Sequence, residues 1–169
     1  SKPGEVPERD YGPEDEGYPE VKTSKAEMEV ARPLFYVGSR IDGEKHGRQL
    51  QTNLLTGELA AEYISGESSA MYIDLYKRGI IGRDYFCGVE SVSSAHFIFF
   101  GGESVDPEKV RERLIAEREK ICKNGIDIEL FTRVKRSLIG KKLRELDEFD
   151  SICYNQAVDT FYGYDAMED

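Results

Sequence analysis

The chain has 169 residues, of which 39% are hydrophobic and 33% are charged, and its formal net charge is −10 at pH 7. This length suits one domain with an ordinary buried core. The negative charge repels phosphate backbones, which argues against a nucleic-acid partner. No apolar stretch approaches the roughly 20 residues of a membrane span, which argues against a membrane partner.

The chain opens with a segment unlike the rest. Residues 1–26 are rich in proline, glycine and acidic residues and lack apolar periodicity, which predicts an extended acidic linker. They contain neither an initiator Met nor a signal-peptide core, so we expect the chain to be a piece of a longer protein. Residues 27–169 are expected to form one domain, and truncation at its end is left open.

A first strand is predicted within residues 27–41, because Leu34–Val37 is rich in residues that favour strands. It ends near the turn pair Asp42–Gly43. Leucines then recur at helical spacing over residues 47–63, which predicts a helix. One face of this helix carries small residues, as expected where a helix lies close against a sheet. They are Gly57, Ala60 and Ala61.

A short second helix is predicted after Gly66. Ser68 or Ser69 can cap it, because a serine oxygen accepts an early backbone N–H, and Gly79 ends it. The residues expected to face inward are Met71, Leu75 and Tyr76.

Two β-rich runs follow, at residues 85–92 and 96–100, and they predict a hairpin or an adjacent antiparallel pair. The run Phe97–Phe100 is apolar on both faces, which is typical of a central strand. The pair Gly101–Gly102 is expected to close this strand.

The remainder is predicted to be helical. Asp106–Pro107 starts one helix, since Asp suits the N-cap and Pro the first helical position. Asp127 starts another, and a last helical pattern covers residues 150–161. The apolar stripes of the first two helices are expected to include Cys122 and Leu146. The order of elements predicts an α+β fold, with a mostly antiparallel sheet and helices packed on one face.

Cationic and metal-binding side chains give weak signals. The densest basic cluster lies between Arg133 and Arg144 and alternates with leucines, which indicates the solvated face of an amphipathic helix. The three cysteines are widely spaced, so we expect reduced thiols and a cytoplasmic location. Neither histidine, His46 or His96, belongs to an H-x-x-E-H motif, and a single His with scattered carboxylates is a poor zinc site.

Several stretches, taken in order, resemble the pitrilysin/insulinase-type zinc metallopeptidases (inverzincins). The likeness covers about residues 31–165, and its clearest parts are Arg32–Gly38, Glu58–Ile81, Gly101–Glu108 and Glu129–Lys135. Members of that family carry two related α/β halves, of which only the first has the H-x-x-E-H zinc motif. The resemblance therefore implies a carboxy-terminal, non-catalytic metallopeptidase half with a LuxS/processing-peptidase-like fold. It is similar to the bacterial zinc-protease branch.

The resemblance implies that this chain has no catalytic residue and no metal ligand and is inactive alone. Zinc would be bound by an amino-terminal catalytic half or by a partner subunit, and the substrate would be a peptide. If the two halves descend from one duplicated unit, the metal-binding helix corresponds to Gly57–Ala61. Gly57 and Ala61 would then replace the ligands, and Ala60 would replace the general base.

The resemblance also places the family's substrate-orienting Arg and Tyr within Leu75–Tyr85. The Arg position falls on Tyr76, directly before two basic residues, and the Tyr position falls near Arg83 or Tyr85. A guanidinium can hold a peptide carbonyl or carboxylate, and a phenol can donate to an oxyanion. In the alternative interpretation, Arg78 and Arg83 are solvated turn residues and the two tyrosines belong to the hydrophobic core. The predicted substrate-binding residues are Tyr76, Arg78, Arg83 and Tyr85.

The leading functional hypothesis is the non-catalytic, substrate-enclosing half of a zinc-dependent peptide hydrolase. The alternative is a catalytically inactive structural or assembly module of the same fold, because some family members are scaffolding proteins of respiratory complexes. An upstream H-x-x-E-H motif with a distal Glu would favour the first hypothesis.

Overall fold

The computed structural model describes residues 22–92 and 95–164. The elements in these ranges are β1 (Leu34–Arg40), α1 (Gly47–Ser65), α2 (Ala70–Lys77), β2 (Phe86–Val92), β3 (Ala95–Glu103), α3 (Pro107–Asn124), α4 (Ile128–Glu145) and α5 (Phe149–Tyr162). None of the described helices is long and apolar enough to cross a bilayer. The predicted α+β class is confirmed.

Most of the predicted linker, residues 1–21, lies outside the described residues. Residues 22–33 form neither helix nor strand, so the first strand begins later than the start of the predicted range, at Leu34. Its pairing explains the boundary, because Leu34 lies opposite Glu103, the last residue of the neighbouring strand.

The sheet is antiparallel in the order β1-β3-β2, which confirms β3 as the central strand. The prediction that Gly101–Gly102 closes this strand is wrong, because β3 continues to Glu103. Both glycines allow a close approach of β2. A Cβ atom on Gly101 would lie 2.6 Å from Cζ of Phe86, and Gly102 has φ +139° with Cα of Tyr85 2.8 Å from where its Cβ would be.

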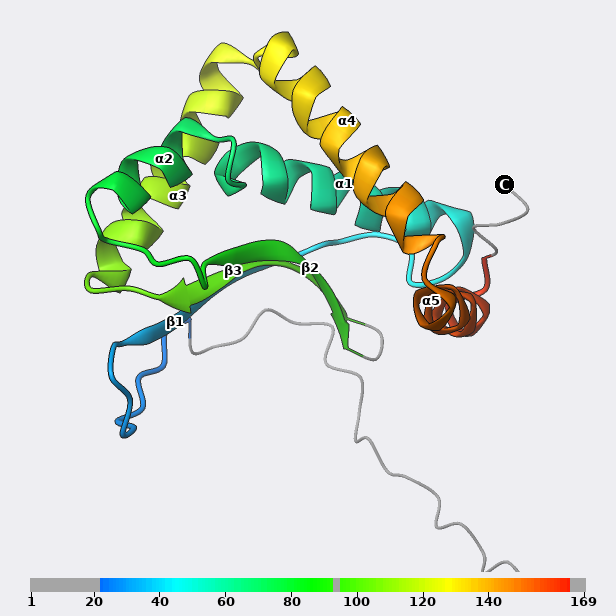
Figure 1. Cartoon of the computed structure of the whole chain (residues 1–169), viewed down its shortest axis with the longest axis horizontal. Coiled ribbons are helices and arrows are strands. Elements are labelled where there is room, and N and C mark those ends of the chain that lie inside the picture. The colour runs from blue at the N-terminus through cyan, green and yellow to red at the C-terminus, as the bar shows by residue number, and fades with distance from the viewer. Residues whose placement is uncertain (1–21, 93–94, 165–169) are drawn as a thin grey trace, which may run out of the picture.

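Helices α1–α4 lie on one face of the sheet (Figure 1). Helix α1 is central, since it contacts β2, β3, α2, α3 and α4. Gly57 permits this closeness, because a Cβ there would already be 3.0 Å from Cγ2 of Val89. The core between sheet and helices consists of Phe35, Ala61, Met71, Leu75, Ile80, Ile81, Tyr85, Phe100, Val110 and Leu114.

Side-chain caps fix the starts of three helices. The Ser69 hydroxyl accepts the backbone N–H of Tyr72 at 3.1 Å, so the cap of α2 is Ser69. Asp106 accepts the N–H of Lys109 at 3.1 Å, and Asp127 accepts the N–H of Glu129 at 2.8 Å. The predicted starts of these helices are confirmed, because each signal needs only a few consecutive residues.

Three residues predicted to face the core are exposed instead. Tyr76 is 39% exposed and Leu146 is 48% exposed, and Cys122 is also exposed. Helical spacing identifies a face, but only the part of that face that meets another element is covered. Cys122 and Leu146 lie near the ends of α3 and α4, beyond the buried residues Leu114 and Val134.

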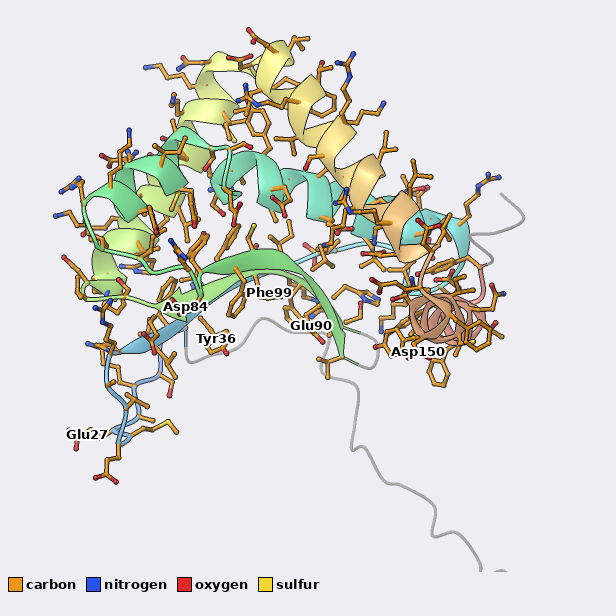
Figure 2. All side chains as sticks on the ribbon, viewed as in Figure 1. Glu27, Tyr36, Asp84, Glu90, Phe99 and Asp150 are labelled. Atoms are coloured by element: carbon orange, nitrogen blue, oxygen red, sulfur yellow. The ribbon has the colours of Figure 1, made fainter. Side chains whose placement is uncertain are left out.

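The second face of the sheet carries aromatic side chains, and no helix within residues 22–92 and 95–164 covers it (Figure 2). Tyr36 is 73% exposed, and its ring centroid lies 5.7 Å from that of Phe86. Phe86 in turn meets Phe99 edge-on at 5.6 Å. We call these three residues the open sheet face.

Candidate functional site

Three of the four predicted substrate-binding residues are linked at the end of α2. Nε of Arg83 donates a hydrogen bond to the Tyr76 hydroxyl at 3.2 Å. The Tyr76 ring stacks on Tyr72 at 5.7 Å, and Tyr72 meets Tyr85 at 5.8 Å. Tyr72 and Tyr76 share a helix face because they are four residues apart. The segment 78–85 then brings Arg83 and Tyr85 back beside these two tyrosines.

The fourth predicted residue, Arg78, is held by its own helix. Its Nη1 lies 3.4 Å from Oδ2 of Asp74, with both side chains well exposed. Arg83 is fully exposed too, and its hydrogen bond with Tyr76 raises the pKa of the guanidinium. The structure therefore places a phenol and a permanent cation together on the surface, with a second cation nearby in sequence.

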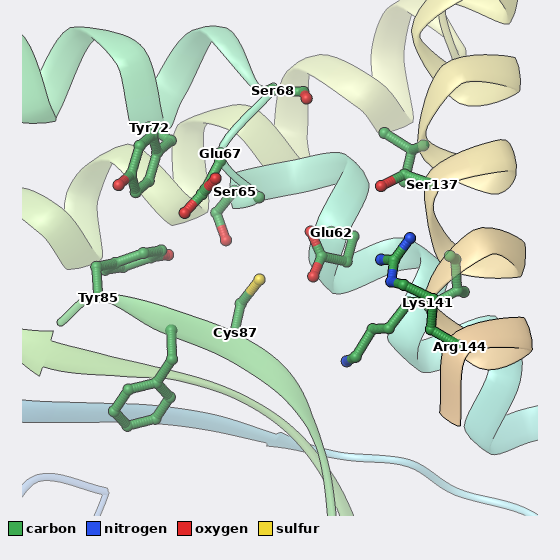
Figure 3. Close-up of a pocket in the computed structure, with 14 residues that line it drawn as sticks. Glu62, Ser65, Glu67, Ser68, Tyr72, Tyr85, Cys87, Ser137, Lys141 and Arg144 are labelled. Atoms are coloured by element: carbon green, nitrogen blue, oxygen red, sulfur yellow. The ribbon is translucent and has the colours of Figure 1, made fainter. Parts of the chain in front are cut away.

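Tyr85 differs from Tyr76, because it is 9% exposed and lies in the floor of a cleft of about 340 Å³. The cleft is bounded by the end of α1, the start of β2 and helix α4 (Figure 3). Its ionisable side chains stand on two walls. Glu62 and Glu67 come from α1 and the turn after it, and Lys141 and Arg144 come from α4.

Burial determines the protonation of the cleft floor. Tyr85 and Cys87 both have raised pKa values because they are desolvated, and the pKa of Cys87 reaches about 12. A thiol with this pKa stays protonated near neutral pH and is a poor nucleophile. Burial also raises the pKa of Glu62, against the opposing charge of Lys141. The hydroxyl of Tyr85 lies near the Ser65 hydroxyl but makes no hydrogen bond of good geometry to a described residue.

The donor set does not fit a zinc ion. Within residues 22–92 and 95–164, no three His, Cys, Asp or Glu side chains are placed to share a metal. His96 is 3% exposed, its Nδ1 lies 2.8 Å from Oγ of Ser91, and its ring meets Tyr162 edge-on. His46 precedes α1 at its N-cap position. The absence of a metal from the whole chain stays a prediction.

Sequence reasoning did not find the cleft. Glu62 and Lys141 stand on helices far apart in the sequence, and only the packing of α4 on α1 brings them together. Lys141 and Arg144 were predicted to lie on a solvated helix face, and both side chains are indeed exposed although they line the cleft. The signal available in the sequence was their spacing of three residues, which puts them on one side of α4.

Two known proteins resemble this chain, one in sequence and one in structure. The chain is 28% identical over 122 residues to the uncharacterized zinc protease YmfH of Bacillus subtilis. Its structure superposes on a crystal structure of a provisionally assigned M16-like peptidase from Alicyclobacillus acidocaldarius with a TM-score of 0.74 and 22% identity. The predicted resemblance to pitrilysin-type metallopeptidases is confirmed. No protein-family model matches the chain.

The matches cover unequal shares of the proteins compared. The Bacillus match covers 72% of this chain but 27% of the relative, and the structural match covers 79% of this chain and 32% of the solved chain. The chain therefore spans about a third or less of either of these two proteins.

Proposed function

We propose that this chain is the non-catalytic, substrate-enclosing half of a zinc-dependent peptide hydrolase. Zinc and the general base belong to an amino-terminal half or to a partner subunit. The similarity to a zinc protease supports the class of reaction, and the unsuitable donor set of the described residues supports the division of labour. The chain's own task is to hold the peptide, and we place this work in the cytoplasm.

The Tyr76–Arg83 pair carries the proposal. The resemblance puts an Arg at the position of Tyr76 and a Tyr near Arg83 or Tyr85, so a phenol stands here where the family has a guanidinium. The hydrogen bond between Tyr76 and Arg83 nevertheless joins a phenol to a guanidinium on an exposed surface. A peptide carbonyl is a suitable acceptor for the remaining N–H groups of Arg83. Arg78 adds a second cation, and Tyr85 contributes through its contact with Tyr72.

Peptide turnover by the intact protein, with its zinc-binding half, tests the proposal. Arg83→Ala is expected to lower kcat/KM by roughly tenfold, as the loss of one charge-assisted hydrogen bond would. Arg78→Ala is expected to have a smaller effect, because Asp74 already engages that guanidinium. Lys77→Ala is the matched control at the same helix end. Unchanged kinetics for both arginine variants would reject the assignment.

A second candidate is a structural or assembly module of the same fold. The open sheet face favours it, because clustered exposed aromatic side chains often mark contacts with other proteins. The two candidates differ in one measurable respect. A module would leave peptide turnover absent even with the complete parent protein and zinc, whereas Tyr36→Ser would weaken its assembly.

A further inference from the structure

The side chains that line the cleft carry charges of both signs, which a ligand can contact. Oε1 of Glu58 lies 3.4 Å from Nζ of Lys141, so this cation is already engaged. No ion pair within 4 Å joins Glu62, Glu67 or Arg144 to any described residue. Two carboxyl groups, from α1 and the turn after it, and one guanidinium, from α4, thus line the cleft, and Figure 3 draws Glu62 between Glu67 and Arg144.

The floor of the cleft supplies an unused polar group. The Tyr85 hydroxyl is buried and lines the cleft beside the Ser65 hydroxyl, and it makes no hydrogen bond of good geometry to a described residue. Leaving a buried hydroxyl unsatisfied costs free energy that a ligand can recover. The Ser65 hydroxyl lines the same floor and offers a second polar contact.

The aromatic side chains that line the cleft favour a ligand cation near Glu62 and Glu67. The rings of Tyr72 and Tyr85 both line the cleft, with centroids 5.8 Å apart and planes tilted by 56°. The face of a phenol ring attracts an ammonium group. Glu62 and Glu67 reinforce this preference, and burial of Glu62 makes a ligand cation there more valuable.

We infer that the cleft binds a free zwitterion of dipeptide size, with its ammonium group between Glu62 and Glu67 and its carboxylate against Arg144. The volume of about 340 Å³ lies at the lower end of the roughly 300–1,000 Å³ typical of small-molecule sites. This site goes beyond the proposed function, because it needs neither zinc nor turnover and neither Tyr76 nor Arg83 lines it.

Three probes test the inference by calorimetry on the full chain: alanyl-alanine, its N-acetyl form and its carboxamide. Each capped probe lacks one of the two charges. Alanyl-alanine is expected to bind, and each capped probe is expected to bind about tenfold or more weakly, as loss of one charged contact predicts. No heat of binding for alanyl-alanine at millimolar concentration overturns the inference. Equal binding of all three probes also overturns it, because the site would then be a neutral groove.

Matched variants locate the two charges. Glu62→Gln and Arg144→Gln are each expected to weaken alanyl-alanine binding by about tenfold. Glu119→Gln and Arg136→Gln are the controls, since both residues are exposed on α3 and α4 and do not line the cleft. Wild-type affinity in both test variants would refute the placement. Thermal unfolding checks that Glu62→Gln folds, and the capped probes decide the question if it does not.

The same titration separates this site from the proposed function. Tyr76→Phe is expected to leave alanyl-alanine binding unchanged, whatever it does to peptide turnover. Weaker binding in Tyr76→Phe would show that the cleft and the surface pair are one site, which contradicts the inference as stated.

Discussion

The Arg83 guanidinium and the Tyr76 hydroxyl meet at 3.2 Å across a turn that separates them by seven residues. The contact lies on the surface, where Tyr76 is 39% exposed and Arg83 is fully exposed. Water can replace either partner, so the contact contributes little to folding.

Tyr76→Phe and Arg83→Gln are therefore expected to leave the thermal unfolding midpoint of the chain unchanged within error. The measurement is differential scanning calorimetry of both variants and the double variant. A clear drop in the midpoint would mean that the pair holds the turn together, and its proposed role in peptide contact would lose its main support.

The cap of α2 gives a prediction about stability. Ser69→Ala removes the acceptor for the backbone N–H of Tyr72 and is expected to lower the free energy of unfolding by about 1 kcal/mol. Ser68→Ala is the control, because Ser68 is exposed and does not cap the helix. Urea unfolding of both variants checks the difference, and equal losses would contradict the cap assignment.

The close packing of α1 on the sheet gives a second prediction about stability. Gly57→Leu forces a side chain against Ile41 and Val89, whose atoms already lie 3.0 Å from the position of its Cβ. We expect a loss of about 1–3 kcal/mol in unfolding free energy, as overpacking typically causes. Gly140→Leu on α4 should be neutral or stabilising, because its Cβ would meet only Nη1 of Arg144 at 3.7 Å. Equal stability of the two variants would show that α1 can move off the sheet.

The thiols are expected to differ in reactivity. Burial raises the pKa of Cys87 to about 12, whereas Cys122 and Cys153 are exposed. Iodoacetamide at pH 8 should modify the two exposed cysteines at least about tenfold faster than Cys87, because the thiolate is the reactive form. Mass spectrometry of peptides from a time course measures the rates. In denaturant the three rates should converge, which shows that the fold protects Cys87.

His96 predicts how stability depends on pH. Burial lowers its pKa below the ordinary value of 6.5, with smaller contributions from His46 and Arg40. The unfolded chain therefore takes up this proton first, and the free energy of unfolding should fall as pH drops from 6.5 toward the lower folded value. Urea unfolding at pH 7.5, 6.5 and 5.5 measures the slope. His96→Gln should flatten it, and an unchanged slope would assign the effect to other groups.

Local signals predicted much of the fold. Asp106 and Asp127 each mark the start of a helix through a few consecutive residues, and the structure places both at the predicted N-cap positions. Gly101–Gly102 misled the same kind of reasoning. A glycine pair usually marks a turn, but here it lets β2 pass close to the central strand, and that need arises only from the packing of Phe86 and Tyr85.

The site was predicted only in part, for a related reason. The resemblance identified the stretch that contains Tyr76 and Arg83, because that stretch is continuous in sequence. It said nothing about Tyr85 as the floor of a cleft, since that role depends on where α4 crosses α1. Arg144 on α4 is exposed like its neighbours, and its spacing of three residues from Lys141 was the only sequence signal for its place in the cleft.

The small residues of α1 have a last consequence, which concerns rigidity. Because Gly57 and Ala61 let the α1 backbone approach the sheet directly, the helix end that carries Glu62 and Ser65 is held firmly in place. A ligand entering there meets a preorganised surface and orders little of the protein as it binds. Any discrimination between ligands should therefore come from shape and charge placement, with induced fit confined to side chains and not to the backbone of α1.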